Sequence, residues 1–160
     1  MKLNTGITEE HARAVADKLN VLLADEYVLY VKTLNYHWSV VGSRFNDLHA
    51  FFERNYKELF LVIDEVAERV RMIGEYPLGS MQEFLKHARL SEDIVSDHPV
   101  KDDIMIQRLL NDYEAIIRSL RVDVGETASV YHDLGTSNFL NDLLEKHEKT
   151  AWMLRSLITQ

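Results

Sequence analysis

Apolar residues recur at three- and four-residue spacings along most of this chain, which is the pattern of amphipathic helices. The first periodic stretch follows Thr8, and the acids Glu9 and Glu10 come directly after it. Acidic groups in a first helical turn are favoured by the positive end of the helix dipole, so a helix is expected to begin at Thr8. This helix is predicted to run to about Tyr36, with an apolar side formed by Val15, Leu19, Leu22 and Leu23.

A second long helix is predicted to end at about Ile73, and either Ser43 or Asn46 can cap its start. The segment 74–79, GEYPLG, cannot continue this helix because it contains proline and two glycines. The pattern then predicts a short amphipathic helix within the connection, on Met81, Phe84 and Leu85.

Two further long helices are predicted in the second half of the chain. The segment Asp97–Pro99 is expected to open the third helix, because proline suits a first helical turn. Gly135 is expected to end the next break, with Thr136 or Ser137 capping a last helix that reaches about Ile158. The apolar residues of the third helix are Ile104, Leu109, Leu110, Ile116, Ile117 and Leu120, and those of the last are Phe139, Leu140, Leu143, Leu144 and Leu154.

Glycine and proline are few, and they mark interruptions of the helical pattern. The breaks are placed at Gly42, Gly74, Pro77, Gly79, Pro99, Gly125 and Gly135. No strand pattern, internal repeat or linker is evident, so residues 1–160 are expected to form one all-α domain. Four long helices, with a short extra helix in the connection between the second and third, predict a four-helix bundle. This connection of about 25 residues is too long for a simple turn, so its short helix must pack on the bundle or on a neighbouring subunit.

Composition narrows the classes of function. The chain contains no cysteine, which excludes disulfides, thiolate metal sites and cysteine nucleophiles. Its formal net charge of −8 disfavours nucleic acid as a partner and suits a cationic cargo. No apolar run is long enough to span a membrane, and the start of the sequence lacks the apolar core of a signal peptide. A cytoplasmic protein is therefore expected.

Four candidate metal ligands share one side of the second helix. His49 and Glu53 are four residues apart, as are Asp64 and Glu68, so each pair projects from one helical face. Glu53 and Asp64 differ by only about 20° around the helix, which places all four groups on one stripe. Along the axis, however, His49 and Asp64 are about 22 Å apart, so one metal ion cannot bind both pairs of a single chain.

Two chains related by a two-fold axis overcome this separation. If their second helices pack antiparallel, the His49/Glu53 end of one chain meets the Asp64/Glu68 end of the other, and the contact creates two such sites. His37 precedes His49 by 12 residues and joins the site if the intervening turn is tight, which a glycine there permits. The resulting two imidazoles and three carboxylates suit iron, with positions left open for an oxidant.

Each ligand pair has an alternative explanation as a solvated helix surface. Asp64 and Glu68 could instead form ion pairs with Arg69 or Arg71. The apolar residues 59–63 favour metal binding, because an acid on an apolar face is costly unless it is paired or coordinated. A metal site inside one subunit's own bundle is not favoured, since no glutamate is followed three residues later by histidine.

The stretch YHWSVVGSRFNDLHAFFERNYKELFLVIDEVAERVRMIGEYPLG resembles the Dps family, the ferritin-like miniferritins. The last helix, LEKHEKTAWMLRSLI, is also similar to that of the family, so the resemblance covers nearly the whole chain. The matching features are His37-Trp38, Gly42, Phe45, His49 with an acid four residues on, Asp64-x-x-x-Glu68-Arg69 and Tyr76-Pro77-Leu78-Gly79.

The resemblance implies a ligand set that is divided between subunits. His37, His49 and Glu53 would come from one chain, and Asp64 and Glu68 from its two-fold mate, as both metal ligands and catalytic residues. Up to two irons are implied per site. Many family members carry Asp where this chain has Glu53, a departure that keeps the ligand type but alters its reach and the occupancy of a second iron.

The resemblance also implies an assembly and a reaction. Twelve subunits would form a hollow shell, and twelve chains of −8 would carry −96 in total, which attracts iron(II). Iron(II) would be oxidised at the inter-subunit sites, usually with hydrogen peroxide, and the ferric mineral would be stored inside. Such a ferroxidase removes iron and peroxide together and protects against oxidative damage.

Further residues receive roles by resemblance. Asp123, Glu126 and Asp133 are candidates for lining ion-entry pores, with ordinary solvated surface as the alternative. Trp38 adjoins His37 and is a candidate quencher of stray radicals, whereas Trp152 is expected to pack in the core. The remaining histidines match no ligand spacing and are taken as surface or structural residues: His11, His87, His98, His132 and His147.

DNA binding is not expected to be strong. Some members of the family coat DNA through a lysine-rich tail, but Lys2 is the only lysine among the first 17 residues, and the terminal sequence RSLITQ has only Arg155. Direct DNA binding is therefore predicted to be weak or absent at physiological salt. A DNA-compacting architectural protein of the same fold with little ferroxidase activity remains the second hypothesis. A monomeric helical bundle without metal is the third.

Overall fold

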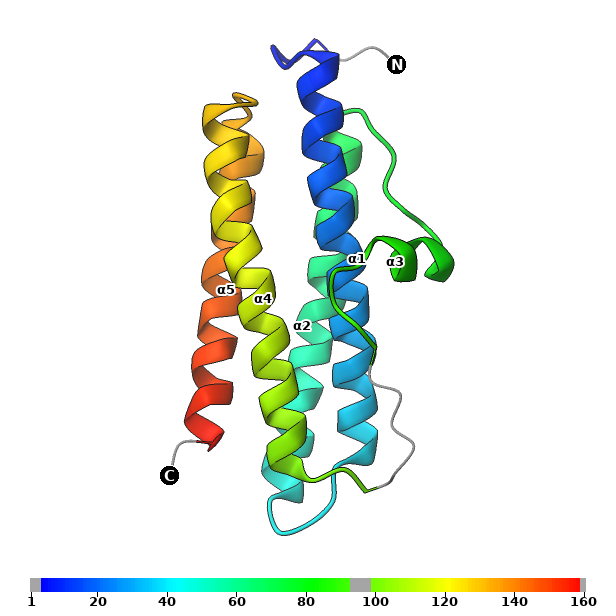
Figure 1. Cartoon of the computed structure of the whole chain (residues 1–160), viewed down its shortest axis with the longest axis vertical. Helices are drawn as coiled ribbons and strands as arrows, with labels where there is room; N and C mark the ends of the chain where they lie inside the picture. The colour runs from blue at the N-terminus through cyan, green and yellow to red at the C-terminus, as the bar shows by residue number, and fades with distance from the viewer. Residues whose placement is uncertain (1–3, 93–98, 159–160) are drawn as a thin grey trace.

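The computed structural model describes residues 4–92 and 99–158, and the helices found there confirm the all-α prediction. They are α1 (Glu9–Ser39), α2 (Phe45–Met72), α3 (Met81–His87), α4 (Asp102–Ser129) and α5 (Leu134–Ile158). The four long helices run side by side as a bundle, and the short α3 lies against α1 on its outer side (Figure 1). Among the described residues, no helix is both long and apolar enough to cross a membrane.

The path of the chain explains the long middle connection. Helices α1 and α2 form one antiparallel hairpin, and α4 and α5 form another (Figure 1). Between the hairpins, the chain returns along the length of the bundle, so that α2 and α4 run in the same direction. The short helix predicted in this connection is α3, which docks on α1 by stacking Phe84 on Tyr27, with ring centroids 3.9 Å apart.

A buried carboxylate fixes the chain just after α3. Asp25, on α1, accepts hydrogen bonds from the backbone N–H groups of Arg89 and Leu90, at 2.6 and 3.1 Å, and from Arg89 Nε at 2.7 Å. Because Asp25 is almost fully buried, these charge-assisted bonds compensate the loss of its hydration. The connection is therefore attached to the bundle at α3 and again at this acid.

The bundle core also contains a polar cluster. Glu26 Oε1 lies 2.7 Å from His147 Nε2, and both residues are buried. The ring edge of Tyr113 packs beside His147, with centroids 5.2 Å apart. Burial raises the pKa of Tyr113 well above its ordinary value, and the charges of Glu26 and Glu58 add to this, so Tyr113 stays protonated. His147 is thus a structural residue, as expected, whereas His98 lies outside the described residues.

The predicted starts of the second and third long helices are wrong. Helix α2 begins after Arg44, which makes no side-chain cap, so neither Ser43 nor Asn46 is the N-cap. Helix α4 begins after Lys101, several residues later than the segment Asp97–Pro99. Pro99 precedes this helix, and Asp97 lies outside the described residues. Neither start has a side-chain cap, and a tertiary contact joins the two: Arg44 Nε donates to Asp102 Oδ2, in the first turn of α4, at 2.8 Å.

The last helix also starts earlier than predicted. Helix α5 begins at Leu134, so neither Thr136 nor Ser137 caps it. Instead, Asp133 accepts the Thr136 N–H at 2.9 Å through its side chain and the Ser137 N–H at 3.0 Å through its carbonyl. Gly135 therefore lies within the first turn, where a Cβ atom would stand 2.8 Å from Arg69 Nη2.

Gly125 does not interrupt a helix, contrary to the prediction. Helix α4 continues through it to Ser129. A glycine within a helix costs about 1 kcal/mol relative to alanine, which the packing of a long helix readily offsets. The predicted start of α1 is confirmed, because Thr8 Oγ1 accepts the His11 N–H at 3.1 Å. The helix continues one turn beyond Tyr36, however, to Ser39.

Candidate metal centre

The turn between α1 and α2 brings His37 and His49 together, as predicted. Gly42 has φ +109° in this turn, a conformation that glycine adopts without strain. The two imidazole rings stack, with centroids 3.8 Å apart and planes 24° apart. His37 is near the last turn of α1 and His49 is in the second turn of α2, so two helix ends position the pair.

Each imidazole is oriented by the backbone of the other histidine. His37 Nδ1 lies 3.0 Å from the carbonyl oxygen of His49, and His49 Nδ1 lies 2.9 Å from the carbonyl oxygen of His37. A carbonyl oxygen only accepts, so both Nδ1 atoms must carry the proton. In the neutral rings, both Nε2 atoms then present a lone pair, which is the arrangement found in metal-binding histidines.

Aromatic residues hold the pair in place. The ring of Phe45 stacks on His49, with centroids 4.9 Å apart, and the ring of Tyr56 meets His37 edge-on at 5.2 Å. These contacts restrict rotation of both imidazoles and provide an apolar wall, which strengthens electrostatic interactions at the site.

Glu53 lies one turn after His49 and forms an ion pair with Lys57, at 2.5 Å between Nζ and Oε1. The hydrogen bond from Lys57 lowers the pKa of Glu53, and the nearby His37 and His49 contribute in the same direction. Glu53 is therefore ionised at neutral pH and ready to bind a cation. Lys57 was not singled out from the sequence, although its four-residue spacing from Glu53 is a signal for such a pair.

Asp64 and Glu68 lie farther along α2 and are exposed. Within the described part of the chain, neither carboxylate has a hydrogen-bond or ion-pair partner. The alternative partners are engaged elsewhere: Arg69 binds Asp133 and Thr136, and Arg71 donates to a backbone carbonyl. Two adjacent carboxylates on α2 are thus left available to a ligand or to another chain.

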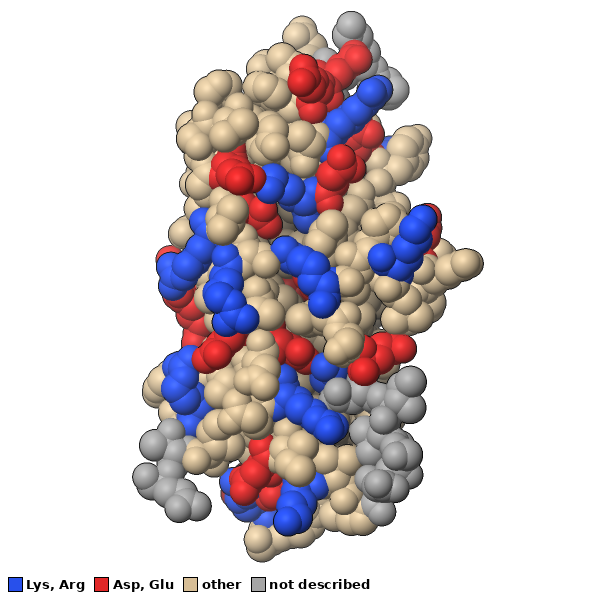
Figure 2. All heavy atoms as spheres, in the orientation of Figure 1, with Lys and Arg blue, Asp and Glu red and all other residues tan. Residues whose placement is uncertain are grey.

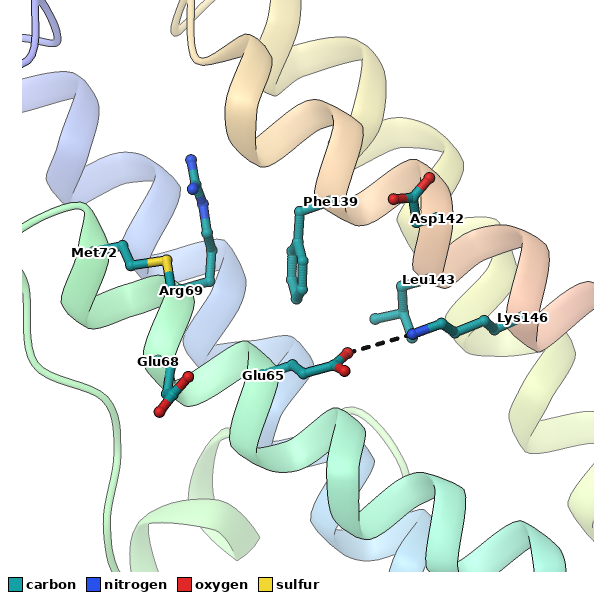
Figure 3. A pocket seen from close by; sticks show the side chains of 8 residues that line it. All are labelled: Glu65, Glu68, Arg69, Met72, Phe139, Asp142, Leu143 and Lys146. Carbon is teal, nitrogen blue, oxygen red and sulfur yellow. Dashed lines mark hydrogen bonds and ion pairs between the residues drawn. The ribbon is translucent and has the colours of Figure 1, made fainter.

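A cleft between α2 and α5, with a volume of about 370 Å³, passes beside Glu68 (Figure 3). Across it, Glu65 reaches towards Lys146, with Oε2 and Nζ 3.4 Å apart. The carboxylate of Glu68 points away from this ion pair. The charge of Glu65 is therefore paired with Lys146 within the chain, whereas Glu68 is exposed to solvent.

A single chain gathers only part of the predicted ligand set. His37 and His49 are in contact, and Glu53 lies close enough for both imidazoles to affect its pKa. In residues 4–92 and 99–158, no three or more histidine, aspartate or glutamate side chains converge on one possible metal position. The arrangement can therefore bind a metal ion fully only if carboxylates arrive from elsewhere.

The two tryptophans are both exposed. Trp38 follows His37 and is 69% exposed, so it is available beside the imidazole pair. Trp152, on α5, is 60% exposed, and the prediction that it packs in the core is wrong for this chain. The residue spacing along α5 does not show whether Trp152 is buried, because the buried face of α5 is set by how α4 packs against it.

The three candidate pore acids have partners within the chain. Lys18 Nζ lies 2.8 Å from Asp123 and 2.6 Å from Glu126. Asp133 is buried, lies 3.3 Å from Arg69 Nη2 and caps α5. Their role in ion entry stays a prediction.

Comparison with known proteins agrees with this geometry. A model of the ferritin-like domain matches residues 16–160. A Dps protein from Vibrio cholerae O1, described as a member of a broad superfamily of ferritin-like diiron-carboxylate proteins, superposes with a TM-score of 0.91 and 33% identity, covering 99% of this chain and 98% of that one. This chain belongs to the Dps family. Family membership gives this Dps chain an iron-storage role.

Two curated relatives extend the comparison. A low temperature-induced protein of Nostoc sp. (strain PCC 7120) is 46% identical to this Dps chain over 157 residues, covering 98% of this chain and 87% of the relative. DNA protection during starvation protein 2 of Bacillus anthracis is 35% identical over 148 residues, covering 92% and 99%.

Proposed function

We propose that this Dps protein is a ferroxidase that oxidises iron(II) with hydrogen peroxide at sites shared by two chains. His37, His49 and Glu53 of one chain would bind the iron, and Asp64 and Glu68 of the two-fold mate would complete the site. The observation that carries this proposal is the reciprocal bonding of the two histidines, whose Nδ1 atoms each donate to the other's carbonyl. This arrangement leaves two adjacent Nε2 lone pairs beside an ionised carboxylate.

The surface of α2 between the two halves supports pairing with a second chain. Phe60 lies on the same stripe as Glu53 and Asp64 and is 60% exposed, and the adjacent Leu61 is 62% exposed. These apolar groups would be covered if two α2 helices packed antiparallel about a two-fold axis. The same packing would carry the unpartnered Asp64 and Glu68 to the partner's histidine pair.

The residues have distinct tasks in the proposed reaction. Each iron(II) gives up one electron. One peroxide accepts two electrons and two protons from solvent as its O–O bond breaks, which yields two waters, so two iron(II) ions are consumed per peroxide. Three carboxylates offset the charge that builds up as iron(II) becomes iron(III). The neutral imidazoles bind without adding positive charge, and the aromatic wall of Phe45 and Tyr56 limits access of water.

The proposed assembly is a homo-dodecamer with a hollow interior, in which the ferric product is stored as mineral. Its expected mass is about 220 kDa, from twelve chains of 18.6 kDa. Removing iron(II) and peroxide together prevents the chemistry that generates hydroxyl radicals. Trp38, exposed beside His37, is proposed to intercept radicals that still form there.

A complementation assay tests the shared site. His37→Ala and Asp64→Ala should each abolish rapid iron oxidation when iron(II) is loaded without oxygen and peroxide is then added. If the two variants are unfolded and refolded together, random pairing should restore about one site in four, because a mixed dimer carries one fully native site. The measurement is the rate of appearance of ferric absorbance.

The matched control mixes His37→Ala with His49→Ala. Both residues belong to the same half of the site, so no pairing of these chains contains an intact set, and activity should stay absent. Equal recovery in both mixtures, or full activity of Asp64→Ala alone, would contradict the shared site.

A second candidate function is DNA compaction; the relatives from Bacillus anthracis and Helicobacter pylori are named for DNA protection during starvation. On the face seen in Figure 2, basic and acidic side chains are interspersed, and no continuous basic stripe crosses it. Lys2, the lysine nearest the start of the chain, lies outside the described residues. At about 150 mM salt, a gel-shift assay is expected to show no tight complex with DNA, because the protein can neutralise few phosphates.

A further inference from the structure

Two histidines meet at the opposite end of α1 from the His37–His49 pair. His11 is in the first turn of α1, and His132 is in the turn between α4 and α5. Figure 1 shows this turn and the start of α1 at the same end of the bundle. The ring centroids of His11 and His132 are 5.9 Å apart, with planes inclined by 56°. Residues 121 positions apart in sequence therefore form an imidazole pair.

His11 has a defined tautomer. Its Nδ1 lies 3.1 Å from the carbonyl oxygen of Tyr131, and the ring of Tyr131 packs edge-on against it, with centroids 5.7 Å apart. Since the carbonyl oxygen can only accept, Nδ1 carries the proton, and Nε2 of the neutral ring presents a lone pair. A backbone carbonyl that orients one imidazole nitrogen so that the other can bind is a recurrent feature of metal ligands.

His132 is held in an unusual backbone conformation. Its φ is +56°, and it is the only residue other than glycine with a positive φ in the described ranges 4–92 and 99–158. This left-handed conformation, just after the end of a helix, is normally taken by glycine or asparagine. An imidazole there costs conformational energy and is placed, exposed to solvent, directly beside His11.

The spacing of the two rings matches joint binding of one metal ion. Imidazole nitrogen binds zinc at about 2.0–2.1 Å, so two rings on one ion have centroids about 5 to 6 Å apart. We infer that His11 and His132 form a site for a divalent transition-metal ion of the class that imidazole binds, with Zn²⁺ as the probe. Water completes the coordination, so the site exchanges its ion readily, unlike a closed four-ligand site.

The test is calorimetric titration with Zn²⁺ of the assembled protein carrying His37→Ala and Asp64→Ala, which weaken the proposed ferroxidase site. In this background, His132→Gly is the informative variant, because glycine suits φ +56° and the turn keeps its conformation. His132→Gly and His11→Gln should each lower the affinity for one Zn²⁺ per chain at least tenfold. Thermal unfolding without metal should show that His132→Gly is as stable as its parent or more stable.

The matched control is His87→Gln. His87, on α3, also has its Nδ1 2.9 Å from a backbone carbonyl, that of Glu83, but no other histidine of the described residues contacts it. The His87→Gln variant should bind Zn²⁺ with the same affinity as the parent protein. Unchanged affinity in His132→Gly or in His11→Gln would overturn the two-histidine site, and so would an equal loss in His87→Gln. The outcome does not depend on the ferroxidase proposal, because the same two ligands of that site are substituted in every protein compared.

Discussion

At the scale of single residues, backbone groups and one lysine determine how the candidate iron ligands are presented. His37 and His49 are oriented by each other's carbonyl oxygens, so their Nε2 atoms stay available whatever the nearby side chains do. Glu53 differs, because its carboxylate is paired with Lys57. An incoming cation must compete with this ammonium group for the same oxygen atoms.

Replacing Lys57 by methionine is therefore expected to strengthen cation binding. The change frees Glu53 and removes a positive charge near the site, and both effects favour iron(II). Because exposed ion pairs are weak, the affinity should rise only about two- to fivefold. Anaerobic calorimetric titration with iron(II) measures this, with Lys149→Met on α5 as a control for the loss of one charge. An affinity that falls in Lys57→Met would show that Lys57 assists the site.

At the scale of elements, the end of the bundle that carries His37 and His49 is tied together by Arg44. From the α1–α2 turn, this residue binds Asp102 Oδ2 at 2.8 Å, Asp103, and the carbonyl oxygen of Leu157 at 3.2 Å. One guanidinium thus joins the start of α2 to the start of α4 and the end of α5. The hydrogen bond from Arg44 lowers the pKa of Asp102.

The Arg44 linkage predicts a pH-dependent loss of stability in Arg44→Gln. A carboxyl whose pKa is lowered by folding stabilises the protein above its ordinary pKa of 3.8, and this contribution disappears as pH falls through the folded value. The free energy of unfolding of the native protein should exceed that of Arg44→Gln by about 1 kcal/mol at pH 7. The difference should become progressively smaller below about pH 4. Urea unfolding of both proteins at pH 7 and at a pH below about 4 tests this. A difference that grows towards low pH would contradict it.

The attachment of α3 and the residues after it to α1 can be tested through Asp25. Asp25→Ala removes the acceptor of the Arg89 and Leu90 N–H groups and leaves them unsatisfied, at a cost of about 2–3 kcal/mol. Hydrogen exchange should accelerate in residues 81–92, while α4 and α5 keep their protection. In contrast, Phe84→Leu should keep the Asp25 bonds and produce a smaller change. Uniform acceleration along the whole chain would mean that the connection is not a separate unit of stability.

At the scale of the whole molecule, the proposed activity depends on assembly. Phe60 and Leu61 leave an apolar surface between the two halves of the ligand stripe on α2. In the proposed two-fold contact, residues near the middle of this stripe face their own symmetry mates. A charge introduced there would meet an identical charge.

Phe60→Glu is therefore expected to dissociate the pair and to abolish iron oxidation at the same time. Light scattering after size-exclusion chromatography gives the mass, and ferric absorbance after peroxide addition gives the rate. Asp64→Ala is the matched variant, expected to lose activity while keeping the mass of the native assembly. An assembled and active Phe60→Glu protein would place the interface elsewhere.

Much of the architecture could be predicted because helical periodicity is a local property. Residues three and four apart share a helix face whatever surrounds them, so the four long helices, the short α3 and the common stripe of His49 and Asp64 follow from spacing. The same spacing shows that one chain cannot gather all five proposed ligands. The Thr8 cap was also predictable, because it contacts only its own first turn.

Only the tertiary structure decided the features that depend on residues distant in sequence. The start of α5 was mispredicted because Asp133 both caps it and binds Arg69, 64 positions earlier. The exposure of Trp152 depends on how α5 packs against α4, and the facing of His11 and His132 depends on how α1 meets the α4–α5 turn. Sequence spacing determines which groups share a helix face, whereas the packing of helices determines which groups find a partner, because burial and hydrogen bonding are set by whichever chain segments come together in space.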